Sequence, residues 1–431
     1  MILIYQFIIA IVITLAFGGC KYSDNNADVK PIDPISHAEI PASLFGLHLY
    51  SSDIPWPTVA FSSNRLWGRF TSWARINTAE GVYDWKLIDS LSDLAQDNNI
   101  DLLYTFGATP QWASSEPTSG PDEPGGFGQG STAPPRDMRY WDDFVRAIVT
   151  HNKERGGRIK YWEIWNEWNL PEFWAGDTAT IVAMAQHAYQ IIKSIDSNAL
   201  VLAPDVAPTD PAGNFDNLVA DYINRFLAAG GGNYADVITF HGYRQNPENI
   251  VSLVNEIRKV MVVNGQSAKP LWDTEGSWGT GAYLPDLDMQ AAFVARYYLL
   301  HWSMGVERFY WYQWVGANPD PQKGWGTLWS SIRGGIQKSG IAYREVYKWL
   351  VGATMTSNCA VQSDGTTWIC SLSRPGDYEA QAIWNTASNV PTQVSSQFRQ
   401  YRNLDGGKVA IQSGDSIIIG IKPILLETKD P

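Results

Sequence analysis

The sequence predicts a TIM (β/α)8 barrel over residues 41–350, followed by a small antiparallel β domain over residues 351–431. Eight apolar, strand-like runs alternate with stretches of helical length up to residue 350, the pattern of a barrel in the α/β class. Beyond that point the alternation stops, and short strand-like runs and turns follow. A doubly wound sheet is the alternative, but the sequence offers neither a glycine-rich phosphate loop nor a GxSxG motif in its support.

The predicted barrel strands are short apolar runs. They are Leu44–Tyr50, Arg65–Arg69, Asp101–Phe106, Ile159–Trp165, Ala199–Ala203, Asp236–His241, Pro270–Thr274 and Arg308–Tyr312. Predicted helices between them include Trp141–Asn152, Thr178–Ile195, Leu218–Ala229, Ile250–Asn264 and Asp288–Met304. The active sites of such barrels lie at the carboxyl ends of the strands, so residues that end different strands are expected to converge there.

One long connection, Ser114–Arg136, interrupts the barrel after its third predicted strand and is rich in Gly, Pro and Ser. Because it follows the carboxyl end of a strand, we expect it to form a wall of the cleft at the active-site face. A disordered insertion is the alternative interpretation.

The region after residue 350 is predicted to be a small sandwich-like accessory domain. Its expected strands include Thr367–Leu372, Ala380–Trp384 and Ser416–Ile421. Cys359 and Cys370 bracket a hairpin-like stretch that has a turn signal at Asp364-Gly365. In an oxidising compartment the two cysteines would form a disulfide across that hairpin, and two buried thiols are the alternative.

The first 19 residues carry no charged side chain, are mostly apolar, and end in small residues before Cys20. This pattern resembles a bacterial lipoprotein signal, which would make Cys20 the acylated first residue of the mature chain. Because no Lys or Arg stands at its start, an uncleaved membrane helix of about 20 apolar residues is the alternative. Residues 21–40 are expected to be a linker. Both interpretations predict an exported, membrane-tethered protein, in the periplasm or at the cell surface.

Composition favours a globular protein, with 45% hydrophobic and 18% charged residues. The formal net charge of −12 and the lack of a basic run argue against a nucleic-acid partner. Twenty Trp and 20 Tyr suit either an aromatic core or the binding of sugars, whose apolar C–H faces stack on flat rings. No HExxH or paired-cysteine spacing occurs, so we expect neither a catalytic metal nor a cofactor.

Two acidic residues lie at predicted strand ends among tryptophans: Glu167, after the fourth strand, and Glu275, after the seventh. A carboxylate in such surroundings is costly to desolvate and usually persists because chemistry uses it. The two are expected to face each other across the barrel mouth. Retaining glycosidases need such a pair, about 5–5.5 Å apart, with one group protonating the leaving oxygen and the other attacking the anomeric carbon. Arg65 and Tyr243 would keep Glu275 ionised, as a cation and a hydrogen-bond donor.

Other acidic residues compete for these roles. Glu163 lies four residues before Glu167 and is expected on the same side of its strand, two layers deeper. Asp273 lies two residues before Glu275 and is expected on the same side, one layer down. We interpret both as paired inside the barrel.

These residues, in this order, resemble clan A of the glycoside hydrolases, and most nearly the family 39 type of β-xylosidase-like enzymes. The likeness covers most of residues 44–350. Besides Asn166-Glu167 and Thr274-Glu275-Gly276, it takes in Arg65-Leu66-Trp67-Gly68, Trp73-Ala74-Arg75-Ile76, Gly81-Val82-Tyr83-Asp84-Trp85 and Gly107-Ala108-Thr109-Pro110-Gln111-Trp112.

The resemblance implies a retaining mechanism with Glu167 as acid/base and Glu275 as nucleophile. It also implies a contact of Asn166 with the sugar 2-hydroxyl, a catalytic subsite lined by His241 and Tyr243, and a stacking platform at Trp311 or Trp314. His48, at the end of the first predicted strand, is expected to touch the sugar.

The sequence departs from the family pattern at two places. Trp168 replaces the proline that commonly follows Asn-Glu, which would reshape the subsite beyond the leaving group. Asn77-Thr78 replaces the usual Glu-Pro after Ile76, which we interpret as a local turn variation. The predicted function is therefore a retaining glycoside hydrolase with a carbohydrate substrate. The alternatives are a transglycosidase that uses the same two residues and a non-catalytic, surface-tethered carbohydrate-binding lipoprotein.

Overall fold

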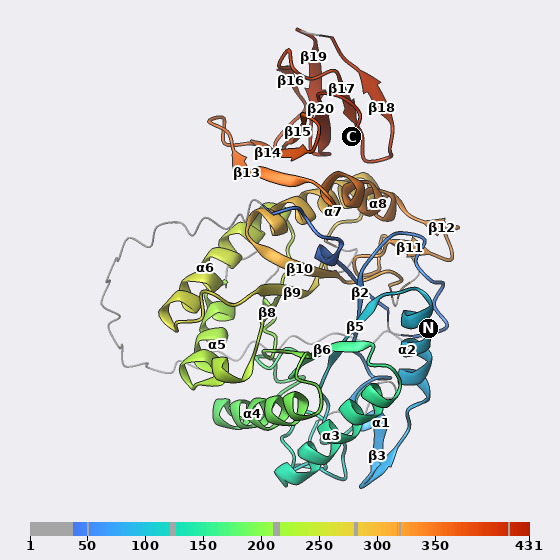
Figure 1. Cartoon of the computed structure of the whole chain (residues 1–431), viewed down its shortest axis with the longest axis vertical. Helices are drawn as coiled ribbons and strands as arrows, with labels where there is room; N and C mark the ends of the chain where they lie inside the picture. Colours follow the sequence, from blue (N-terminus) through green and yellow to red (C-terminus); the bar gives the residue numbers. More distant parts are fainter. Residues whose placement is uncertain are drawn as a thin grey trace, which may run out of the picture. The chain divides into compact units, whose positions relative to one another are not determined.

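In the computed structural model, eight parallel strands form a sheet that curls into a barrel surrounded by helices (Figure 1). The structure describes residues 38–49, 51–120, 126–209, 216–279, 283–316, 318, 320–412 and 414–431. The predicted signal segment with Cys20, and nearly all of the predicted linker, lie outside these residues. Among the described helices, none combines the length and the apolar character that a membrane crossing requires.

The barrel strands coincide with the eight predicted runs, shifted by a few residues at their ends. They are β1 (Phe45–His48), β2 (Ser63–Leu66), β5 (Asp101–Thr105), β6 (Ile159–Glu163), β7 (Leu200–Leu202), β8 (Ile238–His241), β9 (Leu271–Gly276) and β10 (Val306–Trp311). The strands pair in the order β7-β6-β5-β2-β1-β10-β9-β8. A parallel bridge between Leu202 and Val237 joins the two outer strands. The predicted TIM barrel is confirmed.

From β2 onwards, at least one helix follows each barrel strand. The helices are α1 (Trp73–Ile76), α2 (Lys86–Asp97), α3 (Met138–Glu154), α4 (Thr178–Ile195), α5 (Asp216–Ala228), α6 (Ile250–Val263), α7 (Leu287–Ser303) and α8 (Lys338–Leu350). The side chains of Asp137, Asp177 and Asp286 accept backbone N–H groups at the starts of α3, α4 and α7. Such caps satisfy donors that a helix leaves unpaired at its first turn.

Side chains from six positions around the barrel fill its interior. Leu103, Tyr161, Leu202, Val237, Trp272 and Tyr310 form one core cluster. Because they come from different strands around the sheet, they meet on the barrel axis and close it beneath the carboxyl ends. The barrel is therefore a packed core, and the room for a site lies above this layer.

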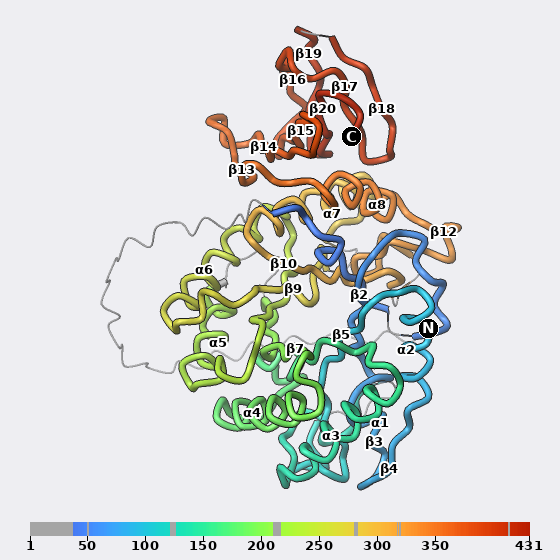
Figure 2. Tube along the Cα trace, viewed as in Figure 1, coloured from blue at the N-terminus to red at the C-terminus, as the bar shows by residue number. Residues whose placement is uncertain are grey.

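After α8 the chain passes directly into β13, the first strand of an antiparallel sheet (Figure 2). This sheet has the order β13 (Thr354–Val361), β14 (Thr367–Arg374), β15 (Tyr378–Asn385), β20 (Ile424–Glu427), β17 (Gln400–Arg402) and β18 (Lys408–Ala410). A two-stranded sheet of β16 (Val390–Gln393) and β19 (Ser416–Ile419) accompanies it. A disulfide joins Cys359 to Cys370, across β13 and β14. The predicted C-terminal antiparallel region is confirmed.

Short elements complete the described chain. They are the strand pairs β3 (Asn77–Ala79) with β4 (Val82–Tyr83) and β11 (Trp329–Ser330) with β12 (Gly335–Ile336), and the 3-10 turns η1 (Ala42–Leu44), η2 (Gly231–Tyr234) and η3 (Pro247–Asn249).

The antiparallel sheet packs on α7, which explains why this helix is buried almost throughout. Two polar contacts tie them together. The backbone N–H of Cys359 donates to Ser303 Oγ at 2.8 Å, and Trp384 Nε1 donates to Glu248 Oε1 at 2.9 Å. Glu248 also accepts two hydrogen bonds from Arg296, whose side chain is 4% exposed. Glu248 thus links a barrel helix to the C-terminal sheet.

Replacing Glu248 with alanine is expected to lower the free energy of unfolding by roughly 3 kcal/mol, because the Arg296 guanidinium would stay buried without its partner. Urea denaturation measures this loss. The control is Glu256→Ala, which removes an exposed ion pair to Lys259 and should cost about 0.5 kcal/mol or less. Equal losses in the two variants would contradict the linking role of Glu248.

Candidate active site

The structure brings Glu167 and Glu275 together above the barrel core. One carboxylate oxygen of each, and one ring nitrogen of His241, lie within 4.8 Å of one another. Glu275 belongs to β9, whereas Glu167 lies four residues beyond the end of β6. The backbone of Glu167 has a φ of +44°, a strained left-handed conformation for a residue other than glycine. Such strain persists only where the surroundings fix the backbone, and functional sites are where it gathers.

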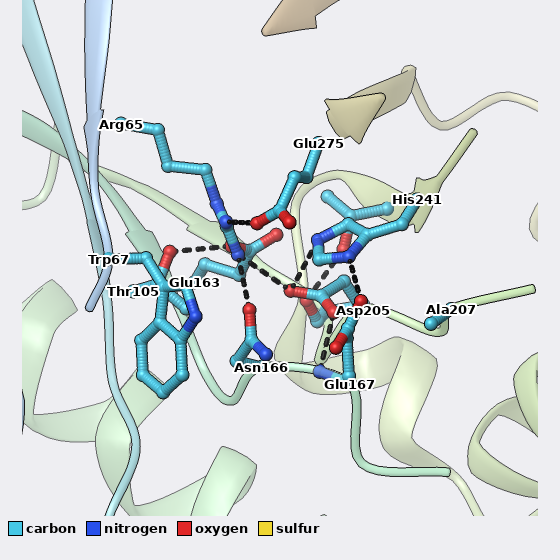
Figure 3. Close-up of polar contacts among 12 residues, drawn as sticks. Arg65, Trp67, Thr105, Glu163, Asn166, Glu167, Asp205, Ala207, His241 and Glu275 are labelled. Carbon is cyan, nitrogen blue, oxygen red and sulfur yellow. Dashed lines mark hydrogen bonds and ion pairs between the residues drawn. The ribbon is translucent and has the colours of Figure 1, made fainter. Parts of the chain in front are cut away.

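Arg65, the last but one residue of β2, lies at the centre of a buried ion cluster (Figure 3). Its Nη1 donates to Glu275 Oε2 at 2.5 Å, and its Nη2 donates to Glu163 at 2.9 Å and to Asp205 at 3.0 Å. Nη2 also lies 2.9 Å from Asn166 Oδ1. The predicted cation beside Glu275 is therefore present, and the same guanidinium holds two further carboxylates.

Asp205 is part of this cluster, and sequence reasoning missed it. It follows β7 by three residues, and its Oδ1 accepts the backbone N–H of Glu167 at 2.6 Å. Its Oδ2 lies 3.0 Å from Arg65 and 3.2 Å from His241 Nε2. This carboxylate therefore helps to hold the strained backbone of Glu167. The available signal was an acidic residue just beyond a predicted strand, the same signal that identified Glu167 and Glu275.

The two catalytic candidates have opposite pKa shifts. Burial raises the pKa of Glu167 above its ordinary value, although a hydrogen bond from His241 opposes the shift. Burial acts in the same direction on Glu275, but the positive charges of His241 and Arg65 outweigh it and lower the pKa of that carboxyl. Glu167 is thus biased towards its protonated form and Glu275 towards its ionised form.

His241, the last residue of β8, lies between these carboxyl groups. Its Nδ1 is 2.8 Å from Glu167 Oε1. Burial would lower the pKa of this imidazole, but the charges of Asp205 and Glu275 raise it well above the ordinary value. The ring is therefore an imidazolium and a hydrogen-bond donor at neutral pH.

Glu167, His241 and Glu275 are also close enough to hold a metal ion, as judged from the described residues. A metal ligand must be a neutral imidazole with a free lone pair. The Nδ1 atom of His241 lies 2.8 Å from Glu167 Oε1, so a metal ion bound at this nitrogen would have to replace that hydrogen bond.

Three other predicted residues surround the pair. The hydroxyl group of Tyr243 donates a hydrogen bond to Glu275 Oε1 at 2.5 Å, the role expected from the sequence. Asn166 directs Oδ1 to Arg65, which fixes the orientation of its amide. His48 lines the cavity, and burial lowers its pKa to about 4, so the ring is neutral. Its Nε2 lies 2.9 Å from the carbonyl oxygen of Trp67.

Glu167 and Glu275 open into a cavity of about 860 Å³. Aromatic rings form much of its lining: Trp67, Phe70, Phe127, Phe173, Tyr243, Tyr283, Tyr312 and Trp325. Phe127 belongs to the long connection Ser114–Arg136, so its described part does form a wall of the cleft, as predicted. A cavity with this lining and few charged groups has the size and character of a small-molecule site.

Three predicted substrate contacts are not at the cavity. Trp311 and Trp314 are fully buried, and their indole N–H groups donate to the carbonyl oxygens of Gly326 and Pro55. Trp168 packs edge-to-face on Tyr222 of α5. The predicted stacking platform is therefore wrong, because the side chains of both residues lie in the core behind the cavity. Trp325, 39% exposed, is the tryptophan that stands at the cavity beside Tyr243, with ring centroids 5.2 Å apart.

The two competing carboxylates have different surroundings. Glu163 is paired inside the barrel, with Arg65 and Thr105, as expected. The expected side for Asp273 is wrong. Phe240 pairs with Asp273 and His241 pairs with Glu275, so β9 has a bulge at Thr274 that reverses the alternation of side chains. Asp273 consequently points away from the barrel axis, where its carboxylate contacts His301 of α7 at 2.8 Å.

Barrels of this kind carry their active sites at this mouth, and glycosidases place a pair of carboxyl groups beside the bond that they cleave. The family model for glycosyl hydrolases family 39 matches residues 70–302, more than half of the chain. The protein belongs to this family, as the sequence predicted.

Related proteins are consistent with this assignment. The chain is 24% identical over 239 residues to a beta-xylosidase of Geobacillus stearothermophilus, which covers 50% of this chain and 45% of that protein. It is 31% identical over 84 residues to a beta-xylosidase of Caldicellulosiruptor saccharolyticus, covering 18% of this chain and 17% of that protein. The match thus spans less than half the length of either relative.

Solved structures share the fold. A family 39 glycoside hydrolase from Bacteroides cellulosilyticus WH2 superposes with a TM-score of 0.70 at 18% identity, covering 92% of this chain and 82% of that one. A monomeric beta-xylosidase from Caulobacter crescentus CB15 superposes with a TM-score of 0.62 at 19% identity, covering 90% and 97%.

His241 is expected to be an imidazolium at pH 7, and Asp205→Asn should lower its pKa because the charge that raises it most is removed. The ring ¹⁵N shifts in NMR spectra report both states, and a His241→Gln variant assigns the signal. His48, which Asp205 does not contact, should remain neutral at pH 7 in both proteins. A neutral His241 ring at pH 7 in the unmodified protein would contradict the charge distribution described above.

Proposed function

We propose that the protein is a retaining glycoside hydrolase, with Glu275 as nucleophile and Glu167 as acid/base. The observation that carries the proposal is the proximity of the two carboxyl groups, with oxygens within 4.8 Å. Retaining enzymes hold their carboxyl groups about 5–5.5 Å apart, whereas inverting enzymes need about 6.5–9.5 Å to admit a water molecule between carboxylate and sugar. The short separation supports attack by the protein itself.

In the first step, a carboxylate oxygen of Glu275 forms a bond to the anomeric carbon as the bond to the leaving oxygen breaks. Glu167 gives its proton to that oxygen. In the second step, Glu167 takes a proton from water, whose oxygen attacks the anomeric carbon and releases Glu275. The raised pKa of Glu167 and the lowered pKa of Glu275 supply the protonation states that the first step requires.

The neighbours of Glu275 support its role as nucleophile. Arg65 and Tyr243 each contact a different oxygen of its carboxylate, which fixes the orientation of the group. Asn166 is held by Arg65 on the same side of the cavity, which favours the contact with the sugar 2-hydroxyl that the family resemblance implies. Trp325 and Tyr312 offer aromatic faces for the sugar ring.

For the substrate, we propose β-xylosides as the first class to test, because two relatives bear the name beta-xylosidase. The alternative of a sugar-binding protein without catalysis predicts a missing carboxylate, whereas both carboxylates are present and lie together.

Glu275→Ala is expected to lower kcat/KM on 4-nitrophenyl β-D-xyloside by several orders of magnitude, and Glu167→Ala by about 10²–10⁴-fold. Azide distinguishes the two roles. With Glu275→Ala it should give a glycosyl azide of inverted configuration, and with Glu167→Ala one of retained configuration, both identified by ¹H NMR.

The control is Glu172→Gln, an exposed residue of the same loop as Glu167, which should leave turnover unchanged. Near-full turnover by Glu275→Ala on a hydrolysed substrate would contradict the assignment of the nucleophile.

We also propose, from the sequence, that the chain is exported and lipidated at Cys20. In bacteria that process lipoproteins, growth with an alkyne fatty acid should label the unmodified protein and should not label Cys20→Ser. The double variant Cys359→Ser/Cys370→Ser controls for labelling at other cysteines and should remain labelled. A membrane-bound protein without label would favour the uncleaved membrane helix.

A further inference from the structure

Three aromatic side chains, Trp67, Phe127 and Phe173, pack on one another at the cavity, and Phe70 lines it as well. We call this set, Trp67, Phe70, Phe127 and Phe173, the aromatic wall. The Trp67 ring stacks on Phe127 at 5.1 Å between centroids and meets the edge of Phe173 at 6.0 Å. Phe127 and Phe173 also meet edge-to-face, at 6.1 Å. Three separate loops, after β2, β5 and β6, contribute these rings.

The indole of Trp67 lies directly against the backbone at Gly107, which leaves room for it in the wall. A Cβ atom on Gly107 would lie 2.6 Å from the ring of Trp67, so a larger residue at that position would displace the indole. The carbonyl oxygen of Trp67 lies 2.9 Å from His48 Nε2, which holds its backbone. Close packing against Gly107 and Phe127 fixes this ring.

Part of the wall is joined to the acid/base by one turn of the chain. The backbone N–H of Leu170 donates to the carbonyl oxygen of Glu167 at 2.8 Å, and that of Phe173 donates to Leu170 at 3.0 Å. One short turn therefore carries the acid and, within six residues, two apolar side chains of the lining. Around Glu275 the aromatic residues differ, since Tyr243 contacts its carboxylate and lies 5.2 Å from Trp325.

A glycosidase must place its acid at the leaving oxygen, so the leaving group lies on the side of Glu167. That side presents three phenylalanine rings, an indole and Leu170, which together offer a large apolar area. Arg69 also lines the cavity there, with its guanidinium over the Phe70 ring at 4.5 Å from the centroid. A second sugar would need partners there for several hydroxyl groups. A flat apolar leaving group would instead bury its apolar surface against these aromatic rings, which is favourable.

Accordingly, we propose that the aromatic wall binds the leaving group and that the natural substrates are glycosides of an apolar, aromatic alcohol or phenol. This inference rests on the proposed glycosidase function and adds the substrate class on the leaving-group side. The long connection Ser114–Arg136 has a corresponding role, because it supplies Phe127 to the wall.

The test compares benzyl and methyl β-D-xylosides, whose leaving alcohols have similar acidity, so the difference in kcat/KM reports binding of the phenyl group. The unmodified enzyme should favour the benzyl glycoside at least about tenfold, the order expected from burying a phenyl group against aromatic rings. Xylobiose, with a sugar as leaving group, completes the comparison. Equal kcat/KM for the benzyl and methyl glycosides, or a preference for xylobiose over both, would overturn the inference and leave the hydrolase function standing.

Phe127→Ala and Phe173→Ala should each reduce the ratio of kcat/KM for the benzyl glycoside to that for the methyl glycoside by about three- to tenfold. The matched control is Phe61→Ala. Phe61 is also half-buried and packs on a tryptophan, Trp56, at 5.5 Å, but it does not line the cavity. The control should keep the preference of the unmodified enzyme. A loss of preference in Phe61→Ala equal to that in Phe127→Ala would show a general effect of destabilisation and would contradict a role for the wall.

Direct binding separates this inference from the proposed activity. 2-Naphthol, which contains no sugar, should bind the unmodified protein and quench its tryptophan fluorescence, with an affinity reduced several-fold in Phe127→Ala and unchanged in Phe61→Ala. Binding with this pattern, in a protein that cleaves none of the glycosides, would refute the hydrolase and keep the apolar site. Failure of 2-naphthol to bind, or equal binding by all three proteins, would refute the apolar site.

Discussion

The site depends on the burial of one guanidinium. Arg65 has no exposed side-chain surface and donates to Glu163, Asp205 and Glu275, which come from three different strand ends. A buried charge is tolerated only when it is paired and its donors are satisfied. Each carboxylate can pair with Arg65 only if its strand end lies close to the guanidinium. The ion pairs therefore hold the ends of β2, β6, β7 and β9 next to one another. The same ion pairs that make the burial of Arg65 tolerable thus fix the position of Glu275, which the proposed reaction requires.

The charges of this cluster also influence which of its carboxyl groups are protonated. Two cations, Arg65 and the raised-pKa His241, face four carboxyl groups at this end of the barrel. Asp205 and Glu275, beside both cations, have lowered pKa values. Burial instead raises the pKa of Glu163 to about 7 and also raises that of Glu167. Two carboxylates then balance two cations, and the remaining pair favours protonation. Glu167 and Glu275 are the same residue type, so their chemical difference arises from their neighbours.

Sequence reasoning predicted what depends on hydrophobic period and strand order. The eight strands, the Glu167–Glu275 encounter and the contacts of Arg65 and Tyr243 all follow from strand ends that meet at one face of a barrel. It failed where a single residue changes the direction of a side chain. The bulge at Thr274 turned Asp273 outwards, and Trp311 and Trp314 point into the core instead of the cavity. Asp205 lies two residues beyond its predicted strand, as Glu167 does, but it was missed because it has no tryptophan beside it in the sequence.

The division between strand ends and loops also separates two functions of the site. The charged residues that would carry out bond cleavage lie on or just after β2, β6, β7, β8 and β9, where the barrel fixes their positions. The aromatic wall comes from the loops after β2, β5 and β6, and left-handed glycines such as Gly68 and Gly128 lie beside its rings. A change in the loop after β2 or β5 would alter the proposed leaving-group side without replacing the acid or the nucleophile, whereas Phe173 lies on the same loop as Glu167. The proposed leaving-group site thus depends largely on loop segments, whose packing strand periodicity does not reveal.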